Sequence, residues 1–138
     1  MGYLKSELCE KNPYHISKHR YYELKHYCMQ YKEWRDIYNR LDMYPSYYET
    51  LYSKLDTNPG NPTEKIASIR ADIRKNVELI EKVAMEADSE LGPYILRAVT
   101  EDLSYPQLQT IYDIPCGKDM YYDRYRKFYY LLSNEKGL

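Results

Sequence analysis

The stretch Ser104–Leu132 reads SYPQLQTIYDIPCGKDMYYDRYRKFYYLL and holds two helical patterns separated by one interruption. Pro115 lacks a backbone donor and Gly117 is conformationally permissive, so a helix does not continue through these positions. Ser104 is a favourable N-cap, and Pro106 falls in the first turn, where a missing N–H is harmless. The pattern predicts a helix that begins after Ser104, a turn, and a second helix over about 118–133.

Each of these two helices is expected to have one apolar side. The first is expected to pack through Tyr105, Leu108 and Ile111. The second repeats its apolar residues at helical spacing, as Tyr121, Tyr125, Phe128 and Leu132. Two helices joined by a turn of this size are typical of a helix-turn-helix unit.

The outward side of the second helix is expected to be polar. Its residues are Lys118, Asp119, Tyr122, Asp123, Arg126 and Lys127. Side chains of this kind reach base edges and phosphates in the major groove of DNA. Residues 116–132 contain four cations and two acids. The same pattern also fits an ordinary helical hairpin with a solvated charged face.

The rest of the chain is helical in pattern too. Ser17 is expected to cap a helix whose apolar spacing slips near residues 30–32, which fits one bent helix or two short ones. Pro45 ends this region, and Ser46 is expected to begin a short helix through Leu55. Thr63 is expected to cap a longer helix over 64–87, and a further helix is expected over about 93–100.

The 64–87 helix has the most regular apolar stripe, formed by Ile66, Ile69, Ile73, Val77, Ile80, Ala84 and Ala87. Its near-heptad spacing is compatible with a homodimer seam. Strand signals are nearly absent, so the fold class is all-α. We expect a tyrosine-rich helical region over 1–55, a linker over 56–63, and a region over 64–138 that ends in the helix-turn-helix.

Composition excludes several classes of protein. The chain has 138 residues, a formal net charge of −1 and 43% hydrophobic residues, which fits a small folded domain. No apolar run approaches the roughly 20 residues of a membrane helix, and no signal peptide is readable. The three cysteines lie far apart, which argues against a zinc finger or a disulfide scaffold and favours a reducing cytoplasm.

No enzyme motif is present, so we expect neither catalysis nor a cofactor. His19, Glu23 and His26 share one helix face and could bind zinc. This spacing occurs easily by chance, so we expect a solvated polar stripe and no metal site there. Cys116 is expected near the start of the last helix, where the helix dipole would lower the pKa of its thiol.

The nineteen tyrosines suggest stacking on nucleic acid, but packing explains most of them better. Those on apolar stripes are expected to be buried. Tyr22, Tyr122, Tyr129 and Tyr130 lie off the stripes and are the better candidates for surface contacts.

The segments Ser104–Leu108, Ile114–Pro115 and Tyr121–Leu132 resemble a sigma-factor region-four type of helix-turn-helix. The chain is similar to RinA/ArpU-type late-gene regulators of phages and prophages of Gram-positive bacteria. A weaker similarity covers Lys18–His26 and Gln30–Trp34.

The resemblance implies that Lys118, Asp119, Tyr122 and Arg126 face the major groove. We expect Lys118, Tyr122 and Arg126 to read bases there, with Asp119 accepting from a cytosine amine. It also implies that Tyr105 and Gln107 touch the phosphate backbone. Arg124 and Lys127 are expected to hold the backbone as well. Asp119 and Asp123 depart from the basic character expected of a recognition helix. Their carboxylates repel DNA phosphates.

We therefore expect a non-enzymatic regulator of transcription in the bacterial host cytoplasm that binds double-stranded DNA, with host RNA polymerase as a candidate second partner. The alternative is a phage-encoded helical protein that binds another protein, either as an inhibitor of a host system or as a packaging subunit. A continuous basic stripe around residues 118–133 would favour DNA, and an apolar or acidic patch would favour a protein partner.

Overall fold

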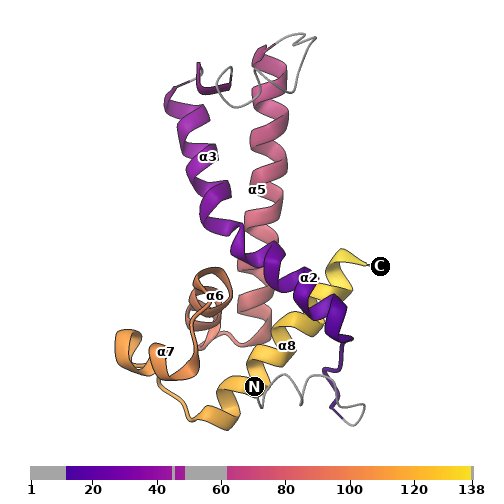
Figure 1. Ribbon diagram of the computed structural model, residues 1–138, viewed down its shortest axis with the longest axis vertical. Helices are drawn as coiled ribbons and strands as arrows, with labels where there is room; N and C mark the ends of the chain where they lie inside the picture. Colours follow the sequence, from indigo (N-terminus) through magenta and orange to yellow (C-terminus); the bar gives the residue numbers. More distant parts are fainter. Residues whose placement is uncertain (1–11, 45, 49–61, 138) are drawn as a thin grey trace. The chain divides into compact units, whose positions relative to one another are not determined.

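The computed structural model describes residues 12–44, 46–48 and 62–137, and Figure 1 shows the helices that these residues form. The helices are α2 (Lys18–Met29), α3 (Tyr31–Met43), α5 (Pro62–Ala87), α6 (Gly92–Glu101), α7 (Tyr105–Tyr112) and α8 (Lys118–Lys136). The described residues contain no strand, so the predicted all-α class is confirmed. Within these same ranges, no helix is long and apolar enough to cross a membrane.

The chain divides into two compact units. The first unit contains the described residues up to Gln30 together with those from Leu79 onward, and the second unit contains the described residues between Tyr31 and Glu78. This grouping differs from the predicted regions 1–55 and 64–138, because α2 groups with the last helices of the chain. Most of the predicted linker and most of the predicted short helix after Ser46 lie outside the described residues.

Local capping explains where several helices begin. The Ser17 hydroxyl accepts the Arg20 N–H at 3.2 Å, as expected for an N-cap of α2. The spacing slip near Gln30 is a helix boundary, since α2 ends at Met29 and α3 begins at Tyr31. The predicted cap at Thr63 is wrong, because α5 already begins at Pro62. Proline suits the first helical position, where no N–H partner is needed.

A capping box begins α7. The Ser104 hydroxyl accepts the Gln107 N–H at 3.4 Å, and the Gln107 side-chain oxygen accepts the Ser104 N–H at 2.8 Å. These two bonds satisfy donors that a helix start would otherwise leave open. Asp113 ends α7 with φ 51°, a left-handed conformation that stops the helix.

In the first unit, α8 packs against α2 and α6, and α6 also packs against α7. The predicted stripe of α8 is confirmed, since Tyr121, Tyr125, Phe128 and Leu132 are all buried. The Tyr21 and Tyr125 hydroxyls lie 2.9 Å apart, so these buried phenols satisfy each other across α2 and α8.

Two expectations about packing are wrong. Tyr129, expected at the surface, is 1% exposed, because the Tyr21 ring of α2 packs edge-on against it at 5.1 Å between centroids. Ile111, expected to pack, is 57% exposed. It lies in the last turn of α7, just before Asp113 turns the chain toward α8.

The second unit consists mainly of α3 and the first part of α5. Its buried side chains include Tyr31, Leu41 and Ile73. Arg70 of α5 lies over the Tyr38 ring at 4.4 Å and pairs with Asp42 at 3.0 Å. Stacking of a guanidinium on an aromatic face adds to helix pairing here.

The apolar stripe predicted as a homodimer seam is largely used within the chain. Ile73, Ile80, Ala84 and Ala87 are all buried. Ile66, Ile69 and Val77 remain half-buried. Packing inside one chain therefore accounts for four of the seven stripe residues, and the homodimer stays a prediction.

Candidate nucleic-acid interface

The loop 113–117 between α7 and α8 is held from both ends. The Ile114 side chain is buried, and its N–H donates to the Leu108 carbonyl at 3.3 Å. The Tyr105 hydroxyl donates to the Cys116 carbonyl at 2.5 Å. The loop is thereby tied to α7 immediately before α8 begins.

Tyr105 is 6% exposed, and its ring packs against that of Tyr121 at 5.5 Å between centroids. Its hydroxyl also accepts from the Gln109 side chain at 3.1 Å. This placement gives no support to the expectation that Tyr105 touches phosphates, because the hydroxyl is used inside the protein. Periodicity placed the ring in the core but could not reveal the partner of its hydroxyl.

The first turn of α8 is open to its surroundings. Gly117 is the N-cap residue and provides no side-chain cap. A Cβ added at Gly117 would meet no other atom within 4 Å. Lys118, Asp119 and Met120 are all exposed. The first N–H groups of a helix favour a negative charge, and the Asp119 carboxylate already provides one in this turn.

Three of the predicted base-reading residues lie four positions apart on α8. Lys118, Tyr122 and Arg126 therefore form one line along the helix, here termed the α8 ridge. Lys118 is exposed, whereas Tyr122 and Arg126 are half-buried. The Tyr122 ring lies 4.9 Å from that of Tyr121 and 6.4 Å from that of Tyr105, between centroids.

Arg126 differs from its neighbours because the described residues provide no partner for it. Its Nε is enclosed and makes no hydrogen bond. The other arginines of the first unit pair with carboxylates, in the pairs Arg20 with Glu23, Arg97 with Glu101, and Arg124 with Asp88. A half-buried cation is more stable with an anionic partner than without one.

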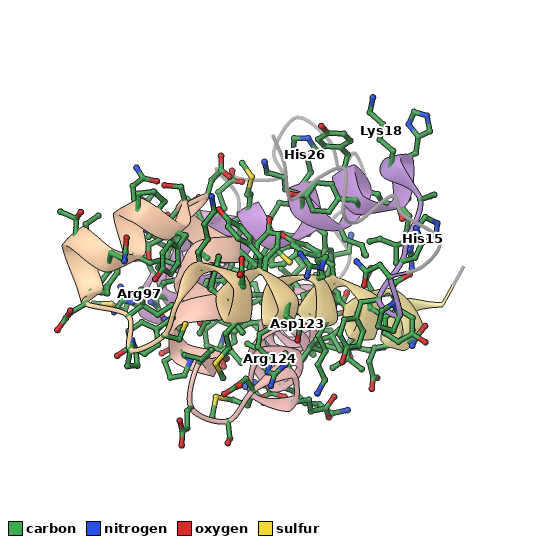
Figure 2. The ribbon with its side chains drawn as sticks, turned by 90° about the horizontal axis from the view of Figure 1, so that it is seen from below. His15, Lys18, His26, Arg97, Asp123 and Arg124 are labelled. Atoms are coloured by element: carbon green, nitrogen blue, oxygen red, sulfur yellow. The ribbon has the colours of Figure 1, made fainter. Side chains whose placement is uncertain are left out.

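Arg124 has a different environment from the expected phosphate contact. Its Nε lies 3.0 Å from Asp88 Oδ2, and it also pairs with Asp123, the neighbour that Figure 2 labels beside it on α8. Arg124 thus ties α8 to the turn before α6. The two carboxylates neutralise the positive charge of Arg124, so this side chain is less available to bind DNA phosphates.

Asp88 was not singled out from the sequence, although its place four residues before Gly92 is a turn signal. Its Oδ1 accepts the N–H groups of Glu90 and Leu91, each at 2.8 Å. The Leu91 N–H chiefly, and then Arg124, lower the pKa of the Asp88 carboxyl. Asp88 therefore links the start of α6 with α8 as a carboxylate.

The remaining predicted contacts have mixed surroundings. Gln107 is exposed, but its side-chain oxygen serves the capping box. Lys127 is half-buried on α8, and Asp119 and Asp123 interrupt the cations along the helix. The surface around α8 therefore lacks a continuous basic stripe among the described residues.

The structure does not bring together the ligands of the metal site considered on α2. No three His, Cys, Asp or Glu side chains come together to hold a metal ion in the described ranges. Within the set His19, Glu23 and His26, Glu23 pairs with Arg20. Figure 2 shows His26 and Lys18 on the outer side of α2, and both are exposed.

The expectation of a lowered pKa for the Cys116 thiol is wrong. Burial, and then the Asp88 carboxylate, raise that pKa. Desolvation and a nearby negative charge both disfavour a thiolate. Cys28 is fully buried, and burial likewise raises the pKa of its thiol.

No family model, curated protein or solved structure matches the chain.

Proposed function

We propose that the chain is a sequence-specific regulator of transcription, of phage or prophage origin, that binds double-stranded DNA through α7 and α8 as a helix-turn-helix. The first turn of α8 enters the major groove. This is a binding function without catalysis, exercised in the bacterial cytoplasm, and host RNA polymerase is a candidate second partner.

The observation that carries this proposal is the unpaired Arg126 on the α8 ridge. Its guanidinium lacks a carboxylate partner among the described residues, in contrast to Arg20, Arg97 and Arg124. Phosphate oxygens and the guanine O6 and N7 atoms both accept bidentate bonds from arginine. In the proposed complex a DNA duplex pairs with the terminal guanidinium nitrogens of Arg126, while the enclosed Nε stays inside the protein.

The neighbouring side chains extend the same interface. Lys118 lies two turns before Arg126 on the ridge, and Asp119 is exposed beside it. In the proposed complex Lys118, Tyr122 and Arg126 contact bases, and Asp119 accepts from a cytosine amine. Lys127 and Gln107 contact the backbone. Arg124 and Tyr105 stabilise the arrangement from inside the protein.

A mobility-shift or fluorescence-anisotropy titration at low salt tests the proposal, with duplexes enriched from a random pool by the full chain. Arg126→Ala is expected to weaken specific binding by about 1–3 kcal/mol. Arg40→Ala is the matched control, because it removes one exposed arginine from α3 in the second unit. Absence of any enriched duplex with folded protein, or an equal loss in both variants, would contradict the proposal.

A second candidate function is docking on a protein partner, and the lack of a continuous basic stripe along α8 favours this candidate over DNA. It is favoured by two large apolar side chains on either side of the loop, Ile111 at 57% and Met120 at 46% exposure. Asp113, Asp119 and Asp123 lie in the same segment. Binding to a protein partner would persist at high salt in samples free of DNA. Contacts to DNA phosphates weaken under those conditions.

A further inference from the structure

The apolar side chain in the first turn of α8, Met120, has no role in the DNA contacts proposed above. Met120 is 46% exposed and lies between Asp119, also exposed, and the buried Tyr121. Gly117, three residues earlier, has open space around it. The thioether of Met120 therefore lies at the N-terminal end of α8. In the proposed complex this end of the helix enters the major groove.

The neighbours of Met120 limit what it can contact. Asp119 disfavours phosphate oxygens at this point, because like charges repel. Base edges in the major groove offer the cytosine amine to a carboxylate and the thymine 5-methyl group to an apolar side chain. Methionine is flexible and polarisable, so it adapts to such a small apolar group.

We propose that Met120 is a specificity-determining residue that contacts the 5-methyl group of a thymine in the bound DNA. This inference rests on the proposed DNA-binding function and names one chemical feature of its ligand. Met120 then discriminates thymine from bases without a methyl group, while Asp119 and Arg126 supply the polar contacts.

The test uses the full chain and a duplex enriched from a random pool. Each thymine of that duplex is replaced in turn by deoxyuridine, which removes only the methyl group. The wild-type protein is expected to lose about fourfold in affinity at one or two positions, as fits burial of one methyl-sized group. Met120→Ala is expected to bind the thymine and deoxyuridine duplexes equally, and Met120→Leu is expected to keep the discrimination.

Met85→Ala is the matched control, because Met85 is also a half-exposed methionine, at 48%, but lies on α5. It is expected to keep the full sensitivity to deoxyuridine. The inference is overturned while the proposed function stands if a duplex is enriched but no thymine is sensitive, or if Met120→Ala keeps the sensitivity. If no duplex is enriched and the chain captures a protein through this surface, the inference and the proposed function fail together.

Discussion

Asp88 shows how one carboxylate connects distant parts of the first unit. It accepts two backbone N–H groups before α6 and pairs with Arg124 of α8. Its side chain is only 13% exposed, so these bonds lie in surroundings where water competes weakly. At the scale of the residue, this network accounts for the position of Arg124 better than a DNA contact does.

Replacement of Asp88 by asparagine is expected to lower the free energy of unfolding by about 1 kcal/mol at neutral pH. The asparagine oxygen can still accept the backbone N–H groups of Glu90 and Leu91, but its NH2 group cannot accept from Arg124, so the ion pair with α8 is lost. The pKa of Asp88 is lowered in the folded protein. Its contribution is therefore complete above the unfolded pKa of about 3.9 and is lost as the pH falls through the folded pKa. Urea unfolding at a series of pH values measures this.

In that series the difference between wild type and Asp88→Asn should shrink in acid. Glu90→Gln is the control, because its backbone N–H keeps the bond to Asp88 while an exposed carboxylate is removed. A difference that stays constant down to the lowest pH would show that the charge of Asp88 does not contribute.

At the scale of the element, α8 is anchored along most of its length. The helix buries five of its side chains, namely Tyr121, Tyr125, Phe128, Tyr129 and Leu132. Its start is set by the Tyr105 hydroxyl, which bonds to the carbonyl of Cys116. The direction of the exposed first turn therefore depends on a buried side chain of α7.

The variant Tyr105→Phe removes this anchor and keeps the ring. Loss of the bond to Cys116 is expected to lower the free energy of unfolding by about 0.5–1.5 kcal/mol. If the proposed function holds, sequence discrimination should fall, while the salt dependence of binding stays unchanged, because no phosphate contact is lost. Thermal unfolding and anisotropy titrations measure the two effects.

Tyr112→Phe provides the comparison for that variant. The Tyr112 hydroxyl accepts from Arg97 at 3.2 Å, away from the loop carbonyl, so its removal should leave discrimination intact. Equal behaviour of the two variants would mean that the bond between Tyr105 and Cys116 does not orient α8.

At the scale of the whole molecule, burial differs between the two units. In the second unit, α3 buries only Tyr31 and Leu41 of its thirteen residues. In the first unit, α2, α6 and α8 share a continuous packed core. Since local opening is easier where few apolar contacts are buried, the units should differ in local stability.

Amide hydrogen exchange is expected to be faster in α3 than in α8. The comparison uses residues in the middle of each helix, so that frayed ends do not dominate. The helices α2 and α6 should exchange slowly with α8, because they pack against it. Protection of α3 equal to that of α8 would contradict this expectation.

Short-range features were predictable from the order of residues. The caps at Ser17 and Ser104, the interruption at 113–117 and the buried stripe of α8 follow from hydrogen-bonding residue types and helical period, which act over a few positions. The same reasoning placed Lys118, Asp119, Tyr122 and Arg126 along the first half of α8.

Contacts between distant segments determine which side chains of α7 and α8 are buried, paired or exposed. Tyr129 is buried because α2 covers a second side of α8, and Arg124 is paired because the turn at Asp88 lies against that helix. Ile111 and Met120 stay exposed because no described element covers them. Residues far apart in the chain meet only through packing, which periodicity along one helix does not encode, so the surroundings of the candidate site required the folded arrangement.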